Sequence, residues 1–393
     1  MDPYTNPFAP GAGSRPPELA GRDGLLGDAR VACRRSIEGR HARGMILLGL
    51  RGTGKTVLLN EIEEIGRAEG HLTAKIEAPE DAALARLLMP QMTKAMRSLS
   101  GVERAKQIAQ RGLGGLRNFA SVFDLEVAGV GISVEPEPGF ADSGDLEHDL
   151  PDLFEEIGRA AQAAGKGWLL LIDEVQYLSA ADLSALIVAL HRISQKRLPV
   201  LFFGAGLPLV AKLAGDAKSY AERLFTYPSI GALDDDAARD AIAKPVRDEG
   251  ADITDEALAS MVAGTQGYPF FLQEWGAHVW DAAEGPTIER QDAAASHEAA
   301  IHSLDQGFFK VRTDRLTKKE GKFVLAMARL GDGPYPIGDI AAALGKTTQA
   351  LGPTRAKIIG KGMVYSTEHG MLDFTVPLYA EHVRRTNPVG DTD

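Results

Sequence analysis

The chain has 393 residues, enough for two or three domains, and its 44% hydrophobic and 25% charged content is ordinary for a globular protein. This composition excludes a wholly disordered chain and, with Cys33 as the single cysteine, a disulfide scaffold. The net charge of −11 excludes a general polyanion binder, yet residues 301–385 hold 13 Lys and Arg against 8 Asp and Glu, a net of +5. Neither a transmembrane stretch nor a secretory signal is visible, so we expect a cytoplasmic protein without membrane contact.

Residues 1–18 are rich in Pro, Gly and Ala and predict a flexible leader. Residues 19–233 alternate short apolar runs with helical stretches, which is typical of a three-layer α/β core with a parallel sheet. Buried strands are predicted at 45–50, 71–76, 168–172, 199–203 and 225–230. Helices are predicted at 56–68, 89–113, 142–165 and 180–195, with a hairpin at 122–134. We interpret residues 89–150 as an insertion that elaborates the structure.

Residues 234–313 carry only helical patterning, and 387–393 form a tail. Between them, residues 314–386 predict a winged helix-turn-helix, with helices at 317–330 and 337–344, a third helix starting at Pro353 after a Gly352 cap, and a hairpin wing. The inner face of the third helix is predicted to be Ala356 and Ile359, with Ile358 as a further candidate.

A winged helix and a net charge of +5 favour contact with duplex DNA. The third helix would then enter the major groove and present Thr354, Arg355 and Lys357. The residues expected to touch phosphates are Lys318, Lys319, Lys361 and Arg384. The alternative is a winged helix that binds a protein partner.

Residues 49–56 read Gly-Leu-Arg-Gly-Thr-Gly-Lys-Thr and fit the phosphate-loop pattern G-x-x-x-x-G-K-[ST]. Its glycines allow backbone N–H groups to turn toward phosphate oxygens, and the following helix presents its positive N-terminus. The predicted cradle consists of Gly49, Gly52, Thr53 and Gly54. Lys55 would reach the β- and γ-phosphates, and the Thr56 hydroxyl would bind Mg²⁺. The alternative is a glycine-rich turn without a ligand.

The apolar run at 168–172 ends in Asp173 and Glu174, at the strand edge where open α/β sheets bind ligands. Asp173 is placed to hold Mg²⁺, directly or through water, and Glu174 to orient and polarise an attacking water. A carboxylate that only caps the next turn is the alternative for this pair.

The loop and the acidic pair together resemble the P-loop ATPases of the AAA+ class. Gly21-Arg22-Asp23 resembles a box of the origin-recognition-type initiators and of the signalling ATPases called STAND, which implies that Gly21 and Arg22 lie near an adenine. Gly267-Tyr268-Pro269 resembles the G-x-P motif of the STAND lid, which implies that 234–313 is a helical lid and that Pro269 lies at the nucleotide. ATP and Mg²⁺ are the implied cofactors.

Arg223 occupies the place of an arginine finger in this resemblance, which implies a homo-oligomer in which it reaches a neighbour's γ-phosphate. A surface ion pair is the alternative for Arg223. The chain departs from the pattern at 204–206, where Gly-Ala-Gly replaces a polar sensor, and at Gln273, where many lids carry arginine. Both departures indicate slow turnover.

The sequence therefore predicts an ATP-binding and ATP-hydrolysing switch that couples nucleotide state to DNA binding. The alternative is a slow nucleotide-gated regulator or scaffold whose winged helix binds a protein.

Overall fold

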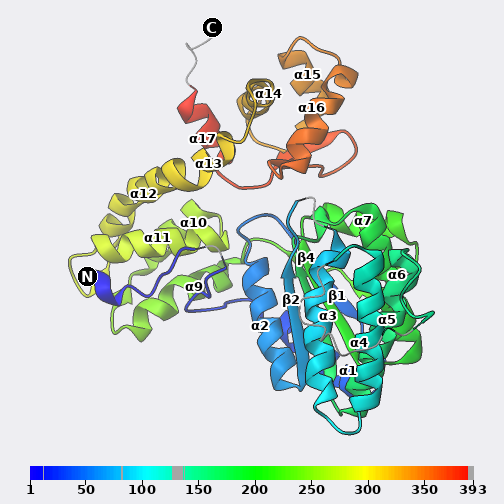
Figure 1. Ribbon diagram of the computed structural model, residues 1–393. Helices are drawn as coiled ribbons and strands as arrows, with labels where there is room; N and C mark the ends of the chain where they lie inside the picture. Colours follow the sequence, from blue (N-terminus) through cyan, green and yellow to red (C-terminus); the bar gives the residue numbers. More distant parts are fainter. Residues whose placement is uncertain (12, 81–82, 126–135, 137, 388–393) are drawn as a thin grey trace. The chain divides into compact units, whose positions relative to one another are not determined.

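The computed structural model describes the chain except for residues 12, 81–82, 126–135, 137 and 388–393 (Figure 1). The described residues divide into two compact units. The sheet unit consists of Arg22–Gly49 and Lys55–Ile230. The helical unit consists of Met1–Gly21, Leu50–Gly54 and Gly231–Asp393. Within the described residues, every helix is too short or too polar to cross a lipid bilayer.

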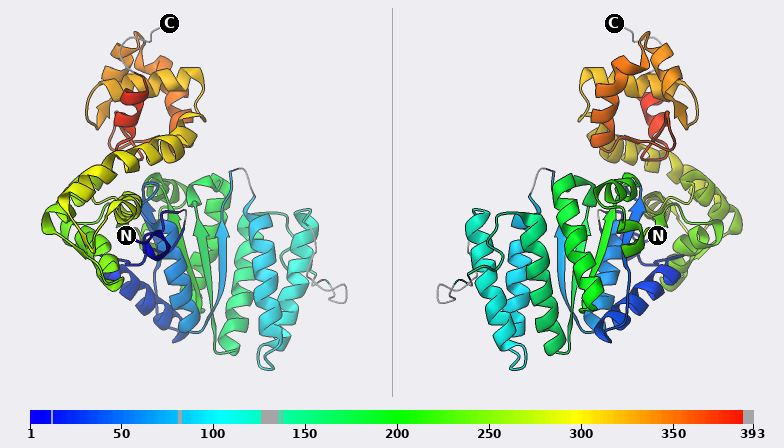
Figure 2. Two further views of the ribbon diagram at one scale, coloured as in Figure 1. Left: turned by 90° about the vertical axis from the view of Figure 1, so that its left-hand side faces the viewer. Right: turned by 90° about the vertical axis from the view of Figure 1, so that its right-hand side faces the viewer.

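The sheet unit is built on a parallel sheet with the strand order β2-β3-β4-β1-β5, in which β6 also pairs with β1. Its strands are β1 (Gly44–Gly49), β2 (His71–Glu77), β3 (Gly167–Asp173), β4 (Val200–Gly206), β5 (Phe225–Thr226) and β6 (Ser229–Ile230). Every residue of β3 and β4 is buried, because helices cover both faces of the sheet (Figure 2). The predicted parallel sheet is confirmed, but the strand predicted at 225–230 is split, with Tyr227 and Pro228 between its two halves.

The helices of the sheet unit are α1 (Asp23–Ile37), α2 (Lys55–Ala68), α3 (Leu84–Ser100), α4 (Lys106–Val122), α5 (Leu146–Ala163), α6 (Ala180–Lys196), α7 (Leu209–Ala217) and α8 (Ala221–Leu224), with a 3₁₀ turn η2 (Val175–Tyr177). Helices α1 and α2 cover one face of the sheet, and α3, α5 and α6 cover the other (Figure 2). The single helix predicted at 89–113 is wrong, because the chain turns at Gly101 and forms two helices. The hairpin predicted at 122–134 falls mostly outside the described residues, and Val122 itself ends α4.

In the helical unit, residues 234–313 form the predicted helices, together with one short parallel strand pair that periodicity did not indicate. The elements are α9 (Asp235–Asp248), β7 (Asp252–Ile253), α10 (Asp255–Thr265), α11 (Pro269–Ala282), β8 (Thr287–Ile288), α12 (Arg290–Leu304), a π-helical turn η3 (Asp305–Phe309) and α13 (Lys310–Thr313). Side chains cap several of these helices, as Asp234 does when it accepts from the Ala237 N–H at 2.8 Å.

The start of the chain packs against α11, so the predicted flexible leader is wrong for its first eight residues. Phe8 is 5% exposed and lies on Gly276, where even a Cβ atom would come within 2.4 Å of the ring. The Asn6 Nδ2 donates to the Ala277 carbonyl at 3.0 Å, and the Trp280 Nε1 donates to the Asp2 carbonyl at 2.9 Å. The burial of the Phe8 ring against Gly276 therefore orders a segment whose composition alone is typical of disorder.

The remaining elements are α14 (Lys318–Arg329), β9 (Tyr335–Pro336), α15 (Ile337–Ala343), α16 (Thr348–Gly360), β10 (Val364–Tyr365), β11 (Met371–Phe374) and α17 (Tyr379–Thr386). Their three strands form an antiparallel sheet in the order β10-β11-β9. Three helices and a hairpin thus follow one another in the predicted order.

The predicted start of the third helix at Pro353 is wrong. Helix α16 begins at Thr348, because the Thr347 side chain caps it by accepting from the Ala350 N–H at 3.2 Å. Pro353 lies inside the helix. The buried face of α16 consists of Leu351, Thr354 and Ile358, whereas Ala356, predicted to face inward, is exposed.

Glu320 anchors the start of α14. Its carboxylate accepts from the Thr317 N–H at 2.8 Å and from the Lys361 ammonium at 2.7 Å, and the Thr317 hydroxyl accepts from the Glu320 N–H in return. The Lys361 ammonium first, and then the Thr317 N–H, lower the pKa of this nearly buried carboxyl from 4.5 to about 2.

We expect Glu320→Gln to flatten the acid dependence of stability. A carboxyl whose folded pKa is lowered stabilises the fold above its unfolded value of 4.5, and this contribution is lost as the pH falls toward 2. Between pH 5 and pH 3 the wild type should therefore lose about 1–2 kcal/mol more unfolding free energy than the variant. Urea unfolding at both pH values measures this difference. Equal losses in the two proteins would contradict the assignment.

Candidate functional site

The phosphate loop adopts the backbone that its glycines allow. Gly52 and Gly54 have φ values of +83° and +90°, a region that side chains other than glycine rarely enter. The Thr53 hydroxyl donates to the Leu50 carbonyl at 2.9 Å and closes the turn. Lys55 is the first residue of α2 and is 7% exposed. A helix N-terminus thus follows a glycine-rich bend, which is the arrangement that binds phosphate groups.

The loop helix and the acidic strand meet through one hydrogen bond. The Thr56 hydroxyl donates to the Asp173 Oδ2 at 2.6 Å, and the Glu174 N–H donates to the Asp173 Oδ1 at 2.9 Å. Asp173 is only 4% exposed. Its two carboxylate oxygens, which water cannot reach freely, thus each receive a hydrogen bond from the protein. A hydroxyl and a carboxylate at this separation are oxygen ligands of the kind that Mg²⁺ prefers. The residues present therefore fit a magnesium ion.

Glu174 follows Asp173 at the carboxyl end of β3, in the left-handed region with φ of 55°. Such a conformation is unusual for a residue other than glycine and often marks a functional turn. The Glu174 side chain is half-buried and accepts from the Gln176 Nε2.

Residues 50–54 of the loop pack within the helical unit. The Tyr268 hydroxyl donates to the Arg51 carbonyl, and the Phe270 N–H donates to the Gly52 carbonyl at 3.2 Å. A Cβ atom on Gly52 would approach the Tyr268 ring to 3.0 Å. The start of α11, which contains Pro269, therefore holds the outer side of the loop.

Two arginines lie beside this contact. The Arg312 guanidinium stacks on the Phe308 ring at 3.6 Å, and Phe308 stacks on Phe270 with ring centres 4.7 Å apart. Burial and, after it, the Arg51 guanidinium lower the pKa of Arg312 to about 10. The Arg51 and Arg312 guanidinium groups together create a positive potential, which suits a polyanionic ligand.

Comparisons with known proteins agree with this geometry. Residues 18–203 match the family described as AAA ATPase domain, and residues 306–383 match a domain of unknown function. The Walker-type ATPase PABY2304 of Pyrococcus abyssi is 16% identical, with a TM-score of 0.55, and the match covers 94% of this chain and 97% of that chain. That likeness shows a shared fold. By this family match, residues 18–203 resemble an AAA ATPase domain.

Two further structures align at lower similarity. The Aeropyrum pernix Orc1 protein in complex with DNA is 14% identical with a TM-score of 0.48, and the match covers 94% of each chain. The Thermotoga maritima RuvB Holliday junction branch migration motor is 15% identical with a TM-score of 0.47, and the match covers 93% of this chain and 95% of that chain. No curated protein matches the chain.

The structure also places four other residues that the AAA+ resemblance singled out. Gly21 has φ of +68° and packs on Ala237, which is sufficient reason for a glycine there. Pro269 is at the first turn of α11, and Gln273 in the same helix is 9% exposed. Arg223 lies exposed on α8.

The C-terminal residues predicted to contact DNA do not share one exposed face. Thr354 is 4% exposed, so its predicted contact with bases is wrong. Arg355 donates to the Ser366 hydroxyl at 2.9 Å, and Lys357 is exposed. Because α16 starts earlier than predicted, Thr348 and Gln349 are its exposed first residues. The signal that could have found them is Thr347, a good capping residue placed just after Gly345.

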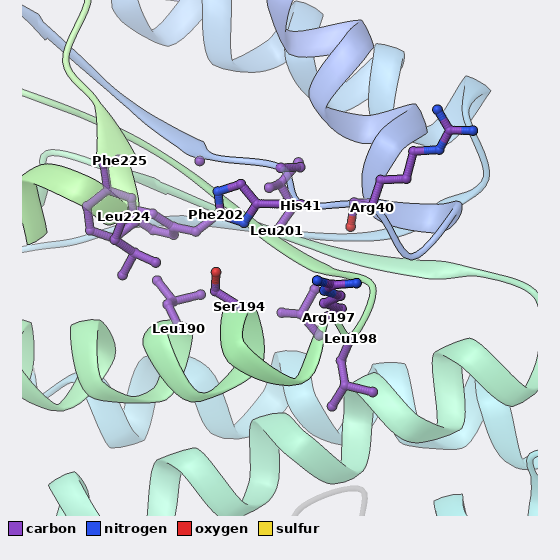
Figure 3. A pocket seen from close by; sticks show the side chains of 14 residues that line it. Arg40, His41, Leu190, Ser194, Arg197, Leu198, Leu201, Phe202, Leu224 and Phe225 are labelled. Atoms are coloured by element: carbon purple, nitrogen blue, oxygen red, sulfur yellow. The ribbon is translucent and has the colours of Figure 1, made fainter.

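A pocket also lies at the opposite, amino edge of the sheet (Figure 3). His41 and Arg197 face it together with apolar side chains such as Phe202 and Leu190, whereas Arg40 points its guanidinium away. Since Gly44 and Val200 begin their strands here, this pocket is separate from the phosphate loop.

We expect Thr56→Ala to destabilise the AAA+ domain, because it removes a donor from the buried Asp173 carboxylate. The loss should be about 1–2 kcal/mol, the value of a hydrogen bond to a charged group that water partly replaces. Thr56→Ser keeps the hydroxyl and should unfold like the wild type in urea. If the alanine variant were as stable as the serine variant, the hydrogen bond would contribute nothing to the free energy of unfolding.

Proposed function

We propose that the protein binds ATP with Mg²⁺ and hydrolyses it slowly, as a switch that couples nucleotide state to DNA binding through its C-terminal residues. The observation that carries the proposal is the 2.6 Å hydrogen bond from Thr56 to Asp173, because it brings the two predicted magnesium ligands together. The family match over residues 18–203 supports nucleotide binding at the same place.

The residues have separate tasks in this proposal. Backbone N–H groups of the cradle (Gly49, Gly52, Thr53 and Gly54) bind the phosphates, and Lys55 neutralises their charge. Thr56 and Asp173 would hold the magnesium ion, which when bound offsets the charge on the phosphates. Glu174, at the left-handed turn after β3, orients the attacking water and takes its proton.

The helical unit supports a switch, because the loop and the C-terminal elements touch within it. The Arg51 guanidinium lies against Gly362, so close that a Cβ atom there would be 3.1 Å from its Nε. Tyr268 and Phe270 hold the carbonyls of Arg51 and Gly52. Phosphate in the loop would bias both contacts, and the bias would pass from the loop to the residues after α16.

Gly21, Arg22 and Pro269 remain proposed contacts of the adenine end of the nucleotide. Arg223 remains a proposed arginine finger, which would act only in a homo-oligomer. Its exposed position on the four-residue helix α8 leaves it accessible to a neighbouring copy.

We expect Glu174→Gln to lower the rate of ATP hydrolysis about 100-fold or more, since the amide cannot accept the water proton. ATP affinity should stay within about threefold, because phosphate contacts are unchanged. Phosphate release and binding of a fluorescent ATP analogue measure the two effects, with Glu103→Gln, whose side chain is 90% exposed, as control. If the wild type hydrolyses almost no ATP and Glu174→Gln behaves in the same way, hydrolysis is excluded, and the protein is better described as a nucleotide-gated regulator or scaffold.

DNA binding by the C-terminal residues is proposed from the net charge of +5 over 301–385, and the order of three helices and a hairpin suits a winged helix. Lys357 on α16 and the exposed pair Lys318 and Lys319 are the cations available for phosphates.

A protein partner is the second candidate, and two contacts favour it. Lys361 is already paired with Glu320, and the Arg384 guanidinium donates to the Ala328 and Gly331 carbonyls at 2.7 and 3.0 Å. Two of the four cations predicted to touch phosphates are therefore engaged within the protein.

We expect duplex DNA to bind the full-length protein at low salt, with an affinity that falls steeply as salt rises. Lys357→Gln should weaken binding to all sequences and lower the slope of log K against log salt by about one, whereas Lys212→Gln on α7 should not. Fluorescence anisotropy across a salt series measures this. No binding at low salt would sink the DNA proposal and favour the protein partner.

A further inference from the structure

Gln176 links the end of β3 to the end of β4. It lies two residues after Glu174 in the turn η2, and its Nε2 donates to the Glu174 Oε2. Its Oε1 accepts from the Leu207 N–H at 3.1 Å. The amide nitrogen thus faces an acceptor and the amide oxygen faces a donor, so only one orientation of the side chain satisfies both bonds.

Gly206, the last residue of β4, makes room for this amide. A Cβ atom on Gly206 would come within 2.7 Å of the Gln176 Oε1 and 2.7 Å of the Val210 Cγ2. In the register of the sheet, β4 separates β1 from β3, and Gly206 lies beside Leu48, just before the phosphate loop. The Gln176 amide therefore stands at the strand end where the sequence lacks a polar sensor side chain.

We propose that Gln176 is the positioning residue for Glu174, an inference that rests on the proposed ATP hydrolysis. The Nε2 donation occupies one oxygen of the Glu174 carboxylate and leaves Oε1 for the proton of water. In the reaction the water oxygen bonds to the γ-phosphorus, and the bond from that phosphorus to the β,γ-bridging oxygen breaks. ADP leaves with that oxygen, and the proton taken by Glu174 passes to the phosphate product.

The hydrogen bond from the Leu207 N–H holds the oxygen of the Gln176 amide, at the end of the side chain that does not contact Glu174. Without it, the Gln176 amide could rotate away from Glu174, because a glutamine side chain has three torsions to fix. Gly206 is also required, because any side chain at this position would clash with the Gln176 Oε1 that Leu207 holds. Glutamine, glycine and a backbone N–H together supply what one polar residue on β4 would otherwise supply.

The first test compares Gln176→Met with wild type. Methionine has a similar length but no amide, so both hydrogen bonds are lost. We expect kcat to fall about 10–100-fold, the effect of losing a well-held catalytic group, with the affinity for a fluorescent ATP analogue within twofold. Gln195→Met, on the exposed surface of α6, is the control. A kcat within twofold of wild type for Gln176→Met would overturn the inference.

A second variant separates positioning from a merely structural role. Gln176→Glu keeps an oxygen for the Leu207 N–H but cannot donate to Glu174. If Gln176 only held the end of β4, this variant would restore wild-type turnover. We expect instead a kcat as low as that of Gln176→Met. Wild-type turnover in Gln176→Glu would therefore also overturn the inference.

Gly206→Ala, combined with Gln176→Ala in a double-mutant cycle, tests whether Gly206 acts through the Gln176 amide. The added methyl should lower kcat in the wild type, whereas in Gln176→Ala there is no amide to displace and only the contact with Val210 remains. Additive effects would contradict a role through Gln176. If the wild type itself releases no phosphate, the proposed hydrolysis fails and the inference fails with it. Normal wild-type turnover with an unaffected Gln176→Met sinks the inference alone.

Discussion

The hydrogen bond between Thr56 and Asp173 joins residues 117 positions apart, and the rest of the sheet unit is arranged to make it possible. Thr56 lies on α2, directly after β1 and the loop, and Asp173 ends β3, whereas β4 lies between β1 and β3 in the sheet. At the end of β4, a Cβ atom on Gly204 would come within 3.0 Å of Val175, and one on Gly206 would come within 2.7 Å of Gln176. The glycines that stand where a polar sensor is expected thus make room for the turn that follows Glu174.

This constraint also ties function to stability. A carboxylate that is 4% exposed costs several kcal/mol unless donors surround it, and Asp173 receives one donor from α2 and one from the following turn. One donor is the Thr56 hydroxyl in the first turn of α2, and the other is the backbone N–H of the next residue, Glu174. The start of α2, the acidic strand and the turn that bears Glu174 are consequently coupled through this one carboxylate, so a change at either donor alters Asp173.

The strands and the phosphate loop could be predicted because their signals are local: apolar runs for buried strands, and fixed spacing for the loop. The failures have long-range causes. Phe8 packs on a glycine far along the chain, and the side chain of Thr354 is buried because α16 starts at a threonine cap that the prediction passed over. The contact of Gln176 with β4 follows from strand order, which no single motif encodes. Sequence periodicity reports which face is apolar but not which distant residue covers it.

The helical unit completes the phosphate loop in a way that follows from peptide geometry. When successive N–H groups turn inward to form an anion nest, the carbonyls of the same peptides turn outward and need donors of their own. Tyr268 and Phe270 supply these donors to Arg51 and Gly52. The start of α11 therefore stabilises the bent conformation of residues 50–54. Its contribution is preorganisation, since donors held on the outer side reduce the conformational freedom that a bound anion would otherwise have to remove.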